Sequence, residues 1–187
     1  MPIQIGAKSH NFSDPTGLLY DCHRRVEMFL GILEAVGKII DQPPSEETTR
    51  ALQSALRYFA EAAPKHTADE EESLFPRLRQ LSDLEVGSAF LRLDRLEADH
   101  RWAAPLHSEV EQLGAKYLFR GPLSAPEVDR FRASVADLIA MYQQHINAED
   151  ELIFPLAARL LSEHEKKAIA NEMAKRRKLR SIDSHLL

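Results

Sequence analysis

The sequence predicts an all-α protein: an antiparallel, up-down-up-down four-helix bundle with an extra short C-terminal helix. Three observations predict this class. The chain has 187 residues, the size of one ordinary domain. Only 7 residues are glycine, which leaves few of the turns that a β-sandwich needs. Apolar residues recur at steps of three and four along most of the chain, which is the spacing of one helix face.

The first two helices are expected over residues 15 to 40 and 45 to 81. Asp14 and Pro15 signal the first start, because an N-cap residue precedes a proline at the first helical position. A proline pair ends this helix, and the serine after it can cap the second one. Pro64 lies inside the second segment, where its missing N–H predicts a kink.

Two more long helices and one short helix complete the pattern. The long ones are expected over residues 82 to 117 and 124 to 160, and the short one over about 163 to 180. The last two each begin with a Ser-x-x-Glu capping box. Short connections make sequential helices antiparallel neighbours. We therefore expect a single domain over residues 1–187, with the bundle at about 15–161.

Composition excludes several classes of protein. Hydrophobic residues make up 44% and charged residues 28% of the chain, which is typical of a globular protein and not of a disordered one. The longest apolar stretch, residues 152 to 158, is far shorter than the ~20 residues that span a membrane. Residues 1 to 14 lack a signal-peptide pattern, and Cys22 is the sole cysteine. We expect a cytoplasmic protein without a membrane partner.

The C-terminal segment is basic although the whole chain is acidic. Residues 164 to 187 contain seven Lys or Arg against three Asp or Glu, whereas the net charge of the chain is -5. A basic helix without interleaved aromatic residues is more typical of a solvated face than of a nucleic-acid interface. Nucleic acid is therefore not an expected partner, and a protein partner stays open.

Six polar residues occupy positions where the helical pattern calls for an apolar side chain. They are four histidines and two glutamates: His23, His66, Glu70, His100, His145 and Glu149. A buried carboxylate without a partner is strongly unfavourable, so these positions call for cations. Imidazoles and carboxylates inside a helix bundle suit iron, manganese or zinc. The set is sufficient for two metal ions that share the two carboxylates.

The heights of the four histidines along the bundle determine whether their side chains can meet. At ~1.5 Å per residue, His66, His100 and His145 fall at one height. His23 falls roughly 10 Å lower on the same count. The height of His23 depends most on where the first helix starts, so a shared layer of ligands is plausible.

The ligand pattern occurs twice in the chain. Residues 66 to 76 and 145 to 155 match at five of eleven positions, which include the histidine, the glutamate and a trailing Phe-Pro. Upstream, His23 and His100 are each followed by arginine and correspond to one another. Each half thus contains a histidine and then, 43 or 45 residues later, His-x-x-x-Glu.

At these residues the chain resembles the hemerythrin-like family, whose repeats bind cations through two histidines and a glutamate. The resemblance covers about residues 18 to 161. It implies a non-haem di-iron centre with an oxo or hydroxo bridge, in which the four histidines are terminal ligands and Glu70 and Glu149 are bridges. It further implies a protein that binds, senses or reacts with O2, NO or peroxide, in redox or stress responses or in iron handling. The residues do not distinguish an enzyme from a binding protein.

Two positions depart from the oxygen-carrying members of that family. Ala104 stands where those proteins have a second histidine, which favours reactivity or sensing over reversible transport. Asp150 lies where they have a bridging aspartate, so Glu149 and Asp150 are alternatives for that role. The symmetry of the repeat, in which Glu149 matches Glu70, favours Glu149.

Several neighbours of the six residues have open roles. His107 lies two turns after His100 and either assists the metal or packs in the core. Tyr20 and Tyr142 each precede a predicted ligand by three residues, and they either face the metals or only pack. The alternative function is a structural module, in which zinc or iron stabilises the bundle and the basic C-terminal helix contacts a partner.

Overall fold

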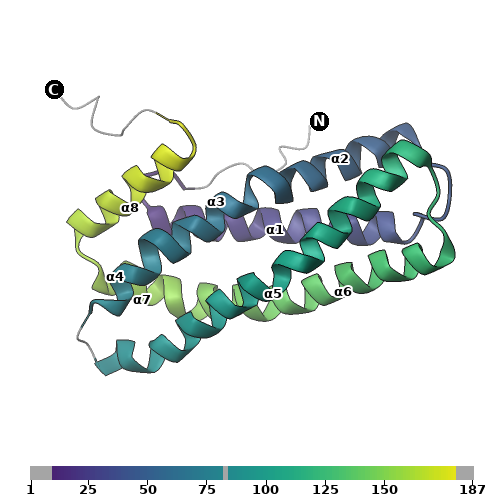
Figure 1. Ribbon diagram of the computed structural model, residues 1–187. Helices are drawn as coiled ribbons and strands as arrows, with labels where there is room; N and C mark the ends of the chain where they lie inside the picture. The colour runs from purple at the N-terminus through teal and green to yellow at the C-terminus, as the bar shows by residue number, and fades with distance from the viewer. Residues whose placement is uncertain (1–9, 82–83, 180–187) are drawn as a thin grey trace. The chain divides into compact units, whose positions relative to one another are not determined.

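The computed structural model describes residues 10–81 and 84–179, without the side chains of residues 84–90 (Figure 1). All regular secondary structure in these residues is helical, which confirms the predicted all-α class. None of the helices in this part of the chain is long and apolar enough to cross a membrane. The expected helix start at Ser82 and Asp83 and the expected end near Arg180 lie outside the described residues.

Two of the four long predicted segments are single helices, and the other two are interrupted at defined residues. The first segment is α1 (Pro15–Gly37) and the third is α5 (Leu84–Arg120). The second comprises α2 (Glu46–Glu61), α3 (Ala63–Ala68), the π-helical turn η1 (Asp69–Leu74) and α4 (Phe75–Arg79). The fourth comprises α6 (Ala125–Ala148), the π-helical turn η2 (Glu149–Ile153) and α7 (Phe154–Leu160). The last helix is α8 (Glu163–Arg176).

The ends of several helices follow from local chemistry. The second segment is interrupted near Pro64, where the sequence predicts a kink: a turn at Ala62 separates α2 from α3. Helix α1 ends at Gly37 rather than residue 40, and Arg132 Nε donates to the Gly37 carbonyl oxygen at 2.6 Å. Helix α5 continues three residues beyond its predicted end and stops at Gly121, whose φ of +86° favours glycine.

Both π turns end at the Phe-Pro pair of the repeat. The Phe75 N–H donates to the carbonyl oxygen of Glu70, and the Phe154 N–H donates to that of Glu149, each five residues back. The proline that follows has no N–H, and its ring crowds the carbonyl group four residues earlier, so the α-helical ladder is interrupted. Such π turns recur at functional sites. Here they occupy equivalent positions of the repeat and carry the two predicted carboxylate ligands.

The chain forms two compact units. The first comprises the residues up to 25, residues 64–97 and those from 146 onward, and the second comprises residues 26–63 and 98–145. Side chains from α1, α4, α5, α7 and α8 share the core of the first unit, and they include Leu19, Phe75, Leu96, Leu156 and Met173. The C-terminal helix therefore packs into this core instead of being an appendage.

The second unit has its own apolar interior. Buried side chains from α1, α2 and α6 fill it, among them Leu33, Leu52 and Phe131. At its edge the rings of Phe29 and Tyr58 stack with centroids 4.3 Å apart. Each unit thus buries apolar side chains from helices that are distant in the sequence.

Candidate metal centre

Four of the six predicted ligands lie together in the first unit. Helix α1 presents His23, α3 presents His66, and the turns η1 and η2 present Glu70 and Glu149. Both glutamates are 0% exposed, and the histidines are 1% and 6% exposed. Ligand atoms of His23, His66 and Glu70 all lie within 4.8 Å of one another. This spacing suits a single metal ion.

The imidazole nitrogens face the carboxylate oxygens. His23 Nε2 lies 3.1 Å from Glu149 Oε2 and 3.7 Å from Glu70 Oε1. His66 Nε2 lies 3.2 Å from Glu70 Oε1. The two imidazole rings are nearly perpendicular, at 84°, with centroids 4.9 Å apart. Nitrogen and carboxylate donors that converge in this way form a ligand set for iron, manganese or zinc.

A third carboxylate, that of Asp150, orients the His23 ring from its other side. Asp150 Oδ1 lies 2.6 Å from His23 Nδ1, and Asp150 Oδ2 accepts a hydrogen bond from Arg24 Nη2 at 2.7 Å. Phe154 stacks on the same imidazole with centroids 5.1 Å apart. Histidines that bind metals commonly use their second nitrogen in this way, which fixes the ring and its tautomer. The Nε2 atom is thereby directed at the two glutamates.

The acidic surroundings govern the charge of His23. Burial by itself lowers the pKa of the imidazole, but hydrogen bonds to Asp150, Glu149 and Glu70 raise this pKa well above its usual value. A proton on His23 therefore balances part of the buried negative charge. A metal cation bound by the same groups replaces that proton, because a histidine binds metal in its neutral form. The donor set and its charge thus fit a metal ion.

The other two predicted ligands form a pair in the second unit. Their rings, His100 on α5 and His145 on α6, lie with centroids 4.6 Å apart and planes at 53°. His145 is 2% exposed, and its Nδ1 lies 3.7 Å from Asp99 Oδ2. Asp99 was not among the predicted site residues, although its position directly before the predicted ligand His100 was a signal for it.

The structure also places the residues whose roles were open. His107 Nε2 and the Tyr142 hydroxyl are hydrogen-bonded at 3.0 Å, and the Phe59 ring lies 4.8 Å from that of His107. Burial lowers the pKa of His107 to about 4, so its ring is neutral at neutral pH. Tyr142 packs near His145, with ring centroids 6.0 Å apart. Tyr20 is 42% exposed, so it does not share this buried environment.

One expectation about the geometry is wrong. Counting along straight helices placed His23 roughly 10 Å below His66, whereas their rings lie 4.9 Å apart. The count assumed that the start of the first helix and the end of the second are level. It also assumed an unbroken second helix, which in fact contains the turn at Ala62 and the π turn η1.

Comparison with known proteins agrees with this site. Residues 14–157 match the family model described as the hemerythrin HHE cation binding domain, and all six predicted ligands fall within them. The chain therefore belongs to the hemerythrin HHE cation-binding family. An uncharacterized protein of Haemophilus influenzae is 25% identical over 170 residues, which cover 90% of this chain and 93% of that protein. Helix α8 lies beyond the residues that match the family model.

Proposed function

We propose that the protein is a non-haem di-iron protein that binds, senses or reacts with O2, NO or peroxide. One observation carries the proposal: buried imidazoles and carboxylates of α1, α3, η1 and η2 converge in the first unit. The doubled motif adds a histidine pair in the second unit. In this proposal the four long helical segments form the antiparallel bundle expected from the sequence.

The proposal gives each side chain a role. The terminal iron ligands are His23, His66, His100 and His145, and the bridging ligands are Glu70 and Glu149. The environments of two neighbouring carboxylates support Glu149 over Asp150 as the second bridge. Both oxygens of Asp150 are engaged, one with His23 and one with Arg24, whereas the fully buried Glu149 faces His23 Nε2. Asp150 therefore positions His23.

Iron in such a site binds small oxygen and nitrogen ligands and exchanges electrons between its ferrous and ferric states. The chain supplies the surroundings. Four buried apolar residues follow the glutamates on the two π turns and exclude water from them: Leu74, Phe75, Ile153 and Phe154. Ala104, in place of a further histidine, leaves one coordination position to a ligand from outside. An open coordination position favours sensing or reactivity over oxygen transport.

The metal content of the chain tests the proposal. Protein purified from its native cells without a metal-binding tag is expected to contain about two iron ions per chain. Its visible spectrum is expected to change on addition of a reductant. Zinc at full occupancy would favour the structural alternative, and absence of any metal would contradict both functions.

Substitution of one bridging ligand tests the assignment of the residues. Glu149→Gln is expected to lower the affinity for iron at least ~10-fold, because the amide replaces a charged ligand at a fully buried position. Glu151→Gln is the matched control, since it makes the same change two residues later at an exposed position. Full iron content in Glu149→Gln would refute its role as a ligand.

A further inference from the structure

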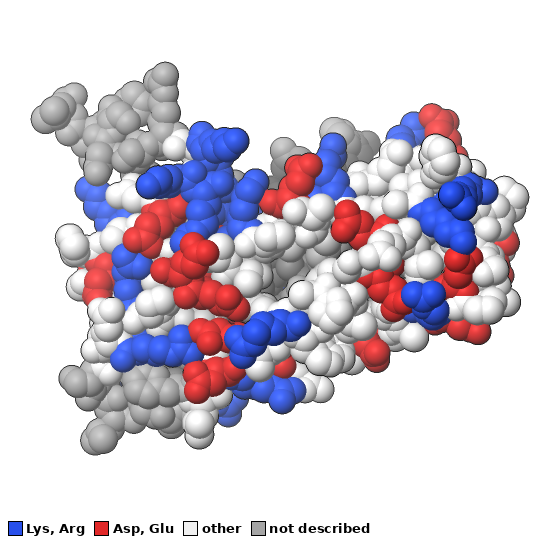
Figure 2. All heavy atoms as spheres, viewed as in Figure 1, with Lys and Arg blue, Asp and Glu red and all other residues white. Residues whose placement is uncertain are grey.

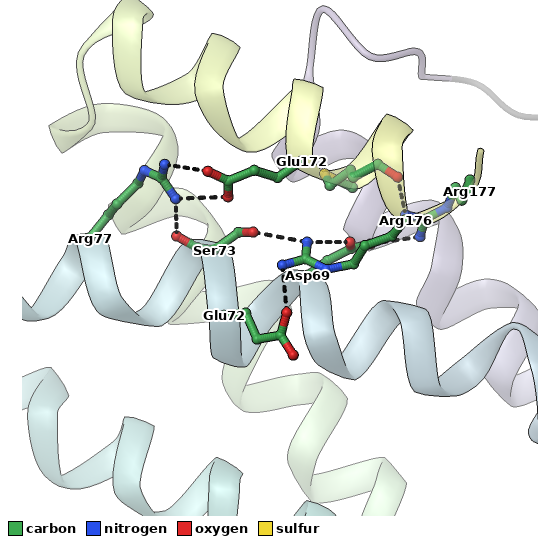
Figure 3. Close-up of polar contacts among 8 residues, drawn as sticks. Asp69, Glu72, Ser73, Arg77, Glu172, Arg176 and Arg177 are labelled. Atoms are coloured by element: carbon green, nitrogen blue, oxygen red, sulfur yellow. Dashed lines mark hydrogen bonds and ion pairs between the residues drawn. The ribbon is translucent and has the colours of Figure 1, made fainter. Parts of the chain in front are cut away.

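The residue before Glu70 is a buried aspartate held by two arginines, Arg176 at the end of α8 and Arg177 directly after it (Figure 3). Asp69 is 0% exposed. Its Oδ2 accepts a hydrogen bond from Arg177 Nη2 at 2.6 Å, and its Oδ1 accepts one from Arg176 Nη1 at 3.0 Å. A buried carboxylate without a partner is strongly unfavourable. The two guanidinium groups therefore stabilise Asp69 in the interior.

Arg176 extends along the π turn that carries Glu70. Its Nη1 also donates to Ser73 Oγ at 2.9 Å, and its Nη2 donates to Glu72 Oε2 at 3.0 Å (Figure 3). A single side chain of α8 thus joins the first residue of η1 to residues one turn later. Because the hydrogen-bond pattern of a π turn departs from that of the flanking helices, these outside contacts hold it in one shape.

A second set of hydrogen bonds, made by Arg77, fixes the position of α8 along η1 and α4. Arg77 of α4 donates to both carboxylate oxygens of Glu172, at 3.1 and 2.8 Å. Its Nη1 also donates to the carbonyl oxygen of Ser73 at 2.7 Å. Such paired hydrogen bonds between arginine and a carboxylate fix orientation as well as distance. The arginine pair at the end of α8 is therefore held over η1.

Arg177 also interacts with the residue before another predicted ligand. Burial by itself lowers the pKa of Arg177, but the ion pair with Asp69 and a further interaction with Cys22 raise it above its usual value. Cys22 directly precedes His23 on α1. The cation therefore interacts with the neighbours of two predicted ligands, Glu70 and His23.

We propose that α8 is a positioning clamp for the metal site: Arg176 and Arg177 hold Asp69 and thereby fix the orientation of Glu70. The inference rests on the proposed function, since it takes Glu70 as a ligand. The clamp is specific to one half of the repeat, because Ala148 occupies the position that corresponds to Asp69. It also comes from a helix beyond the residues that match the family model.

The surface around α8 agrees with this role for its arginines. Figure 2 shows basic side chains gathered on α8 with acidic side chains beside them. The side chains of Arg176 and Arg177 are only 19% and 21% exposed, whereas Lys175 and Lys178 of the same segment are exposed. The two arginines are therefore engaged within the chain instead of being presented to a partner.

Binding of Co²⁺ to the full-length, metal-free chain tests the clamp. Arg177→Met is expected to weaken Co²⁺ binding roughly 10-fold, the loss typical of removing a group that orients a metal ligand. The visible absorption bands of bound Co²⁺ are expected to shift, because they report the arrangement of ligands around the ion. Lys166→Met is the matched control, since it removes a cation of α8 that pairs with Glu163 on the same helix.

The outcomes separate the clamp from a purely structural effect. Unchanged affinity and unchanged bands in Arg177→Met would overturn the proposal, whatever the stability of that variant. If Arg177→Met does not fold, Asp69→Asn, which keeps the size of the side chain, carries the same test with the same expected result. Failure of the unsubstituted chain to bind Co²⁺ or iron would instead overturn the proposed function and the clamp with it.

Discussion

The two π turns carry the same ligand motif but differ in what surrounds it. At η1, the residue before Glu70 is Asp69, which is held from outside by Arg176 at the end of α8 and by Arg177 directly after it. At η2, the residue after Glu149 is Asp150, which orients His23. The arginines thus stabilise η1 from outside, whereas Asp150 of η2 itself orients a residue of another helix, His23. The comparison teaches that a duplicated motif keeps its histidine and glutamate while the residues around them diverge.

The ion pair beside Glu70, Asp69–Arg177, and the ion pair beside Glu149, Asp150–Arg24, are called the η1 support and the η2 support. They also differ in their exposure to water. Asp69 is 0% exposed, and its partner Arg177 is 21% exposed. Asp150 is 12% exposed, and its partner Arg24 is 45% exposed. An ion pair costs more to break when the remaining charge stays buried. The η1 support should therefore contribute more to stability than the ion pair at η2.

The largest expected effect is a difference in stability between two arginine variants. In the metal-free chain, Arg177→Met is expected to lower the free energy of unfolding by about 3 kcal/mol, because Asp69 stays buried with Arg176 as its remaining arginine. Arg24→Met is expected to lower it by less than about 1 kcal/mol, since Arg24 is 45% exposed and water weakens its interaction with Asp150. Urea unfolding of both variants measures the difference. Equal losses would show that the two supports are energetically alike.

The next effect is a pH dependence that depends on His23, whose imidazole interacts with Asp150 and Glu149 of η2 and with Glu70 of η1. The raised pKa of His23 means that the folded, metal-free chain binds a proton more tightly than the unfolded chain does. The resulting stability is complete below the unfolded pKa of about 6.5 and is lost as the pH rises through the folded value. The free energy of unfolding should therefore fall above that pH, with a slope of at most about 1.4 kcal/mol per pH unit.

Two matched variants assign this slope to the correct carboxylate. Asp150→Asn removes a hydrogen bond that raises the pKa of His23, so the slope is expected to become smaller. Glu71→Gln changes the corresponding residue of η1 and is expected to leave the slope unchanged. Urea unfolding at a series of pH values measures both. A full slope in Asp150→Asn would contradict the role of this carboxylate.

The candidate ligands could be singled out in the sequence because they violate the helical pattern. Polar residues on an apolar stripe are conspicuous, and the repeat links His66 with His145 and Glu70 with Glu149. All of these residues except His66 are at most 2% exposed, and His66 is 6% exposed. The fold class followed from the same periodicity, since an apolar stripe has to be covered by other helices.

The supports could not be predicted, because they depend on contacts between distant segments. Asp69 and Arg177 are 108 residues apart, and the basic composition of α8 favoured a solvated face instead. The π turns were missed for a different reason. The Phe-Pro pairs were recognised as part of the repeat, but the hydrogen bond from Phe75 back to Glu70 becomes evident only in the backbone geometry.

The smallest expected effect tests which carboxylate of η1 transmits the clamp. Glu72 also accepts a hydrogen bond from Arg176, but its side chain is 68% exposed. Glu72→Gln is therefore expected to lower the free energy of unfolding by less than about 0.5 kcal/mol, because water replaces the lost charge interaction. Urea unfolding of Glu72→Gln and of Arg177→Met under the same conditions measures the two losses. A comparable loss in both variants would mean that α8 acts on η1 through its exposed edge and not through the buried Asp69.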